Sequence, residues 1–178
     1  MIIGGIGGAN TTTGIRFEGE VDLLVKLAGL PGYEICGNAI QYHGRTIAYS
    51  YRKHSLYAYL AEQGIDWKDY ISKRLLPDDA IYVVKDNTVY IIEIKFQQVA
   101  GSVDEKLQTC DFKKKRYQKL FSALNYDVEF IYILNDWFKN ESYRDVLDYI
   151  VAVGCHYYFE YLPLERLGLP VPEEQLVS

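Results

Sequence analysis

The stretch that decides the fold is PDDAIYVVKDNTVYIIEIK, residues 77–95. Residues 80–84 and 89–95 are rich in β-branched and aromatic side chains, which favour strands. Between them lies Lys85-Asp86-Asn87-Thr88, whose Asp-Asn centre suits a tight turn. The pattern predicts a β-hairpin in which Asp86-Asn87 is the loop and Lys85 faces Thr88.

This pairing predicts which side chains share a face of the hairpin. It sets Lys95 opposite Asp78 and Glu93 opposite Ala80, and residues that are opposite, or two apart on one strand, share a face. The predicted polar face carries Asp78, Glu93, Lys95 and Gln97. The predicted apolar face carries Ile81, Val83, Ile92 and Ile94. Asp79 would point with the apolar set, so Asp78 is favoured, although a loop one residue longer or shorter would reverse that choice.

Two carboxylates and an ammonium on one face suit phosphodiester hydrolysis. The carboxylates can hold Mg²⁺ and leave coordination positions for water and a phosphate oxygen. The ammonium can orient the water, help to deprotonate it and offset developing negative charge. Three charges on a central strand are costly without such a use. The competing interpretation is a simple ion pair between Glu93 and Lys95 on an exposed strand.

Pro77-Asp78, fourteen intervening residues and Glu93-Ile94-Lys95 resemble the core motif of the PD-(D/E)XK nuclease superfamily. Two flanking segments, GGIGGANTTTGIRFE at residues 4–18 and FQQVAGSVDEKLQT at residues 96–109, resemble type II restriction endonucleases within it. The likeness covers the N-terminal fifth of the chain and roughly residues 77–134. The core motif alone is short and degenerate, and its combination with the flanks makes it specific.

The resemblance implies an α/β (α+β) fold with an αβββαβ core, in which a mixed sheet is flanked by helices. It implies Mg²⁺-dependent cleavage of double-stranded DNA at a specific sequence, usually by a homodimer, with a cognate DNA methyltransferase as a further partner. It assigns metal binding to Asp78 and Glu93 and a catalytic role to Lys95, which Gln97 would join on the polar face. In many members a glutamate on the first core helix assists; Glu18 fits, and Glu20 is the alternative.

Three other functions remain open. The first is another nuclease with the same core, such as a junction resolvase or a repair enzyme. The second is a non-catalytic DNA-binding subunit, against which an intact Asp-Glu-Lys set argues. The third is an unrelated α/β protein that carries the motif by chance.

The rest of the chain predicts helices alternating with strands, and hence a mixed sheet covered by helices. An apolar stripe of Phe17, Val21, Leu24 and Ala28 predicts a helix over residues 15–28. Ser102 and Glu105 form a capping box for a helix that runs to about residue 124 and is broken near Asp111. Other predicted helices cover residues 55–63, 67–73 and 142–153, and predicted extended segments cover residues 39–51, 128–134 and 156–162. We expect one domain over residues 1–178, with residues 30–76 as a candidate DNA-recognition insertion.

Cationic residues gather in two segments that are candidates for DNA contact. Arg52-Lys53-His54 lies among tyrosines, and arginine and lysine can read guanine edges in a major groove. The denser segment comprises Lys113, Lys114, Lys115, Arg116 and Lys119. On a helix these cations spread around most of the circumference, so the segment is either a phosphate-contacting surface or an ordinary solvated face.

Composition narrows the remaining classes. The 178 residues carry a net charge of −5, which argues against non-specific coating of DNA but leaves a local DNA cleft open. No apolar run approaches the length of a membrane span, and the N-terminus lacks the pattern of a signal peptide. Three widely spaced cysteines favour reduced thiols in a cytoplasmic protein over a disulfide framework or a zinc site. Neither the three histidines nor the glycine-rich start matches a metal, nucleophile or phosphate-loop motif.

Overall fold

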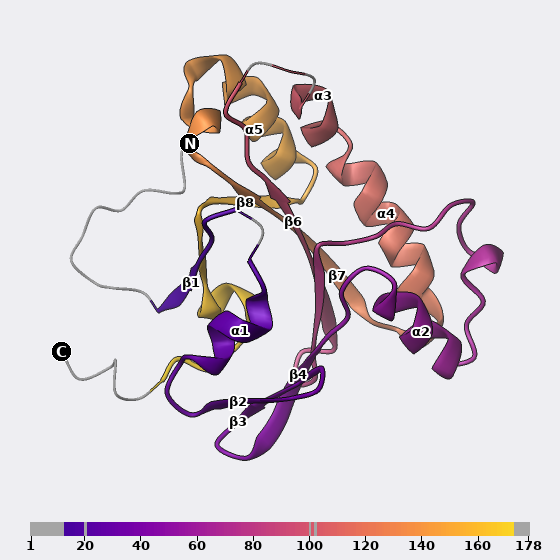
Figure 1. Ribbon diagram of the computed structural model, residues 1–178. Coiled ribbons are helices and arrows are strands. Elements are labelled where there is room, and N and C mark those ends of the chain that lie inside the picture. Colours follow the sequence, from indigo (N-terminus) through magenta and orange to yellow (C-terminus); the bar gives the residue numbers. More distant parts are fainter. Residues whose placement is uncertain (1–12, 20, 100, 102, 173–178) are drawn as a thin grey trace.

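A seven-stranded sheet forms the centre of the molecule in the computed structural model, which describes residues 13–19, 21–99, 101 and 103–172 (Figure 1). The strand order is β2-β3-β4-β5-β6-β7-β8. The first five strands pair antiparallel with one another: β2 Tyr33–Cys36, β3 Ala39–Tyr42, β4 Arg45–Ser50, β5 Asp79–Val83 and β6 Thr88–Lys95. The chain is therefore mixed α+β, as predicted, with a mostly antiparallel sheet flanked by helices.

The last two strands of the sheet, β7 Asp127–Leu134 and β8 His156–Phe159, run parallel to β6. Parallel neighbours need a crossover connection, and helices provide both. Helices α3 Val103–Leu107 and α4 Cys110–Phe121 connect β6 to β7, and α5 Arg144–Ala152 connects β7 to β8. A separate two-stranded sheet pairs β1 Gly14–Arg16 with β9 Tyr161–Pro163.

Both faces of the large sheet are buried. The face that we call the α4 face packs against α4, α5 and α2 Ser55–Glu62, and β5 and β6 contribute Ala80, Val89 and Ile91 to it. The α1 face packs against α1 Leu23–Ala28 and the small sheet, and the same strands contribute Ile81, Val83 and Ile92. Figure 1 shows α1 and α4 on opposite sides of the sheet. The predicted apolar set lies together, but a polar opposite face was wrong because helices cover both sides.

The β5–β6 hairpin has a different register from the predicted one. Val83 pairs with Thr88 and Asp79 with Ile92, so the connection is the four residues 84–87 instead of two. Asn87 adopts a left-handed backbone (φ 53°) and its carbonyl accepts from the amide of Asp127, which ties the turn to the start of β7. The pairing moves by two residues, an even number, so every side chain keeps its predicted face.

The first helix is shorter than predicted. Ile15 and Phe17 are buried and Arg16 between them is exposed, a period of two that belongs to β1 and its continuation. The helix begins only at Leu23, after Asp22 accepts a capping hydrogen bond from the amide of Leu24 at 3.0 Å. The helical stripe predicted from Phe17 was wrong, because the buried helical pair is Leu23 and Leu27.

Elsewhere the predicted elements are largely confirmed, with local breaks. The helix after the hairpin is interrupted at residues 108–109, close to the predicted break, and its Ser102 cap lies outside the described residues. Residues 67–73 contain only one 3₁₀ turn, η1 Trp67–Asp69. The predicted strand 156–162 divides at Glu160, whose φ is 55°, into β8 and β9 of different sheets. Further 3₁₀ turns are η2 Ser122–Leu124, η3 Asp136–Lys139, η4 Glu141–Tyr143 and η5 Leu164–Leu167.

Residues 30–76 belong to the central sheet. They supply β2, β3 and β4, and β4 pairs directly with β5. The segment continues through α2 and returns to the hairpin at Pro77. No helix formed by the described residues has the length and apolar character that crossing a bilayer requires.

Candidate functional site

The turn that follows β4 is hydrogen-bonded to the segment that begins at Pro77, at the end of the hairpin remote from its loop. The amide of Tyr51 donates to the carbonyl of Ala80 at 2.8 Å, and the amide of Lys53 donates to that of Pro77 at 3.0 Å. Arg52 Nε donates to the carbonyl of Asp78 at 3.3 Å. These bonds continue the pairing of β4 with β5 beyond the strand end, so residues 50–53 and 77–79 are held as one unit.

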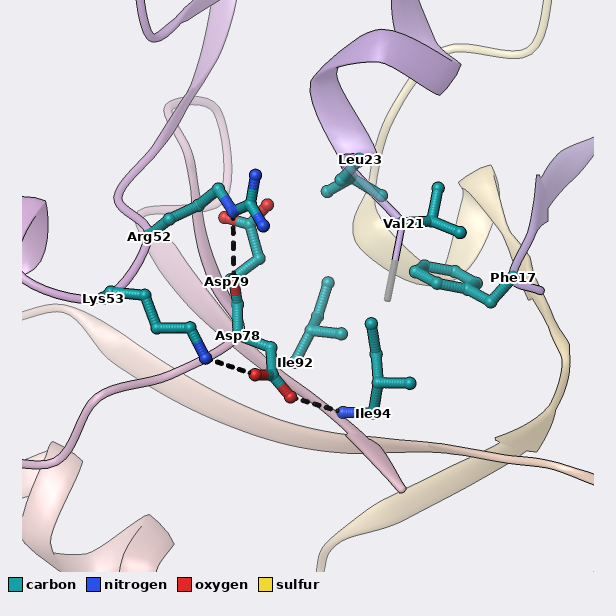
Figure 2. Close-up of a pocket in the computed structure, with 9 residues that line it drawn as sticks. All are labelled: Phe17, Val21, Leu23, Arg52, Lys53, Asp78, Asp79, Ile92 and Ile94. Carbon is teal, nitrogen blue, oxygen red and sulfur yellow. Dashed lines mark hydrogen bonds and ion pairs between the residues drawn. The ribbon is translucent and has the colours of Figure 1, made fainter. Parts of the chain in front are cut away.

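Both oxygens of the Asp78 carboxylate are held. Oδ1 lies 2.5 Å from Lys53 Nζ, and Oδ2 accepts from the amide of Ile94 at 2.8 Å (Figure 2). Lys53 has a left-handed backbone with a φ of 48°, a conformation that costs a non-glycine residue on the order of 1 kcal/mol. The strained turn thus directs an ammonium onto the predicted metal-binding aspartate.

Glu93 lies on the α4 face and is only 7% exposed. Its Oε2 is 3.0 Å from Lys113 Nζ on α4 and 3.6 Å from Lys95 Nζ on the same strand. Continuing the hairpin register by one pair from Asp79–Ile92 sets Asp78 across from Glu93. Two carboxylates and three ammonium groups therefore gather at one end of β5 and β6.

Asp79 lies on the α1 face with the apolar side chains, as the hairpin pattern predicts. It is 4% exposed, and its Oδ1 accepts from Ser50 Oγ and from its neighbour's amide, both at 2.8 Å. Its Oδ2 is buried and has no hydrogen-bond partner among the described residues. Burial raises the pKa of this carboxyl to about 6, against the lowering effect of those two hydrogen bonds. Asp79 is thus a buried acid that forms no ion pair with any residue that the structure describes.

A small cavity adjoins both aspartates on the α1 face. About 20 Å³ of it is accessible to water, room for about one molecule. Its lining comprises Phe17, Val21, Leu23, Arg52, Lys53, Asp78, Asp79, Ile92 and Ile94 (Figure 2). The cavity is too small to accommodate a nucleotide, and Glu93, Lys95 and Lys113 are not among its lining residues.

Two predicted site residues lie apart from this cluster. Glu18 is exposed in the bend between β1 and α1 and is not on a helix, while Glu20 lies outside the described residues. Gln97 is buried, and its backbone amide and carbonyl bond to the Asn135 side chain at 3.2 and 2.7 Å. Gln97 therefore anchors the segment after β6 to the end of β7.

The two cationic segments do not form two separate surfaces. In the first, Lys53 contacts Asp78 and Arg52 lies 3.3 Å from Asp22, while His54 is exposed at the start of α2. In the second, Lys113 points inward and contacts Glu93. The other four cations have different partners or are exposed. Lys114 binds the carbonyl of Gly154, Lys115 pairs with Asp111, Arg116 binds the carbonyl of Lys73, and Lys119 is exposed.

The role of Lys113 as a partner of Glu93 was missed, although a signal for it exists in the sequence. Lys113 lies four residues before Tyr117 and seven and eight before Leu120 and Phe121, all of which are buried. Residues at this spacing share one face of a helix. A lysine on that face points toward the sheet, and only a partner such as Glu93 makes its partial burial favourable.

Whether the site could hold Mg²⁺ depends on its acidic side chains. Within the part of the chain that the structure describes, no three histidine, cysteine or acidic side chains are grouped closely enough to hold a metal. Mg²⁺ is usually held by one or two carboxylates, with water and substrate phosphate completing its coordination. Asp78 and Glu93 supply that donor type and number, so the residues fit the predicted ion.

Comparisons with protein-family models, with curated proteins and with solved structures gave no match. The geometry of the site is therefore the basis for its chemistry. Carboxylates that are ordered before a ligand arrives, with more ammonium groups than carboxylates around them, suit a ligand that brings both a metal ion and an anion.

Proposed function

We propose that this protein is a magnesium-dependent nuclease that hydrolyses phosphodiester bonds in double-stranded DNA. One observation carries the proposal: Lys53, Lys95 and Lys113, from three separate elements, surround Asp78 and Glu93 at one end of a hairpin. The chain as a whole is acidic, with a net charge of −5, so this local excess of positive charge is not a by-product of composition. A phosphate-bearing substrate accounts for it.

The order of elements gives independent support. When β2, β3, α2 and α3 are left out, the order is α1, the antiparallel strands β4, β5 and β6, then α4, then β7 parallel to β6. This agrees with the αβββαβ core that the resemblance to PD-(D/E)XK nucleases implies. Strands β2 and β3 and helix α2 are then additions to that core, and residues 30–76 become the variable part in which sequence-reading contacts are expected.

Each group in the cluster has a role in hydrolysis by in-line attack of water. Asp78 and Glu93 would hold Mg²⁺, which when bound lowers the pKa of a coordinated water and polarises the phosphate. Lys95 orients the water and stabilises negative charge that develops on the phosphate. Lys53 and the Ile94 amide fix the orientation of the Asp78 carboxylate, so it reaches the substrate already ordered.

The finer parts of the proposal come from the resemblance. A restriction-type enzyme would cut at a specific sequence, act as a homodimer and be accompanied by a cognate methyltransferase in the cytoplasm. Of the cationic residues, His54, Lys115 and Lys119 are exposed and remain candidates for DNA contact. Glu18 remains a candidate assistant because its neighbour Phe17 lines the cavity beside Asp78.

The test is cleavage of plasmid and phage DNA with Mg²⁺, with EDTA, and with the Lys95→Ala variant. Lys85→Ala is the matched control, because Lys85 is exposed at the opposite end of the same hairpin. We expect discrete fragments from the wild type and the control, and none with EDTA or Lys95→Ala. Equal cleavage by wild type and Lys95→Ala, or indifference to Mg²⁺, would show that the assigned site is wrong.

The same preparation separates the rival functions. A junction resolvase would leave linear duplex intact and cut a four-way junction. A non-catalytic subunit would shift DNA in a gel without cutting any substrate. The second result is not expected from a chain that retains both carboxylates and the strand lysine.

A further inference from the structure

Helix α4 packs on the sheet face that carries Glu93 and contributes two polar side chains there, Lys113 and Tyr117. Lys113 Nζ is 3.0 Å from Glu93 Oε2, closer than the 3.6 Å of the strand lysine Lys95. One turn further along the same face lies Tyr117, whose side chain is fully buried. The sequence placed Lys113 among the candidate DNA-contacting cations, and it assigned no role to Tyr117.

The hydroxyl of Tyr117 is unusual. It is buried and has no hydrogen-bond partner among the described residues. Burial raises the pKa of this phenol above its ordinary value, and the negative charges of Glu93 and Asp78 raise it further, so it stays protonated and is a hydrogen-bond donor. An unsatisfied buried hydroxyl destabilises a fold, and phenylalanine would avoid that cost. A structural role alone therefore does not explain it.

We propose that α4 forms the second half of a phosphate-binding site. Lys113 is a catalytic residue that binds a phosphate oxygen of the substrate, and Tyr117 is a positioning residue whose hydroxyl donates to Glu93 when the phosphate draws Lys113 away. The proposal rests on the proposed nuclease activity for its reaction but on α4 alone for its residues. It accounts for two cations on one carboxylate oxygen, since one is released to the ligand and the other stays.

The alternative is that Lys113 only neutralises a buried carboxylate. Single-turnover cleavage and thermal unfolding of Lys113→Gln, Lys113→Arg and Tyr117→Phe separate the two. We expect Lys113→Gln to slow cleavage about a hundredfold, as for loss of one donor to a developing charge, with partial recovery in Lys113→Arg. Tyr117→Phe should keep or raise Tm, because it removes an unsatisfied hydroxyl, and yet slow cleavage about tenfold.

Two matched controls guard against general effects of charge or of the substitution type. Lys139→Gln removes an exposed lysine paired with Asp136, and Tyr157→Phe removes a hydroxyl on the last strand of the sheet. Both should cleave like the wild type. If the wild type cuts and Lys95→Ala does not, yet Lys113→Gln and Tyr117→Phe cut normally, the proposal for α4 is overturned and the nuclease assignment stands.

Binding of inorganic phosphate, followed by ³¹P NMR with Mg²⁺ present, tests α4 without any cleavage. We expect Lys113→Gln to weaken binding at least about fivefold and Lys139→Gln to leave it unchanged. Phosphate binding that depends on Lys113 in a protein that cuts no DNA would overturn the nuclease proposal and support the phosphate site. Absence of phosphate binding in the wild type, or equal binding by Lys113→Gln, would overturn the proposal for α4.

Discussion

Each face of the β5–β6 hairpin buries one acidic side chain, and the two are treated in opposite ways. On the α4 face Glu93 has two ammonium groups within 3.6 Å. On the α1 face Asp79 has a hydroxyl and an amide as donors and a buried oxygen with none among the described residues. Burial penalises the charged form of a carboxyl, and nearby cations offset that penalty. Near-equal burial thus identifies one acid suited to metal binding and one suited to packing.

The largest expected effect is on activity and separates the two acids directly. Glu93→Gln keeps the shape of the side chain but removes a metal ligand, so we expect cleavage to fall on the order of a thousandfold, or about 4 kcal/mol. Asp79→Asn should stay within about threefold of the wild type, because it contacts neither lysine nor substrate. Plasmid cleavage rates at saturating Mg²⁺ measure both. Equal losses would erase the distinction between the faces.

The second prediction tests whether both faces are covered equally. Ile91 points to the α4 face and Ile92 to the α1 face, and they are 0% and 1% exposed. Ile91→Ala and Ile92→Ala should each lower the free energy of unfolding by about 3 kcal/mol, from lost burial and the cavity left behind. Urea unfolding of both variants is the measurement. A near-zero effect at Ile91 would restore the single apolar face that the strand pattern predicts.

The third prediction concerns the pH dependence of stability at Asp79. Its pKa of about 6 in the folded protein exceeds its ordinary 3.8 because burial disfavours the charge. The stabilisation is therefore complete below the ordinary pKa and is lost as the pH rises through about 6. Between about pH 4 and pH 8 the wild type should lose about 3 kcal/mol relative to Asp79→Asn. Parallel urea titrations that stay a constant distance apart would contradict this.

The smallest effect is expected from the hydroxyl that partly satisfies Asp79. Ser50→Ala removes the 2.8 Å bond from Ser50 Oγ, which should lower stability by about 1 kcal/mol near neutral pH. Since that bond lowers the pKa of Asp79, its loss should move the pH midpoint of the stability change upward from about 6. A carbon-detected NMR titration of the aspartate carboxyl groups measures the midpoint. A downward movement would mean that Ser50 bonds to the protonated acid.

The hairpin and the faces of its residues could be predicted because they depend on local pattern. The β-branched runs indicate strands, and the register error of two residues leaves Asp79 on its predicted side. The start of the first helix could not be predicted, because Ile15 is extended through its pairing with Leu162, 147 residues later in the chain. Local periodicity carries no information about such a partner.

In the candidate site, too, the residues related by local spacing could be predicted and those brought in by long-range contacts could not. The Asp-Glu-Lys set was visible as spacing on two adjacent strands. Lys53 joined it through a turn held by a backbone bond to Pro77, and Lys113 joined it from the helix that connects β6 to β7. Charge counts reveal neither. Instead, they made each residue appear part of a separate basic surface.

The bond from the Ile94 amide to Asp78 Oδ2 turns one backbone position into a reporter. An amide that bonds to a side chain exchanges its hydrogen with solvent whenever that side chain swings away. Its exchange rate therefore follows the seating of the acid, residue by residue, in the resting protein. Ligands that secure Asp78 should slow exchange at Ile94, and ligands that pull it outward should accelerate it. The exchange rate of the Ile94 amide therefore reports whether a ligand occupies the site, without any reaction taking place.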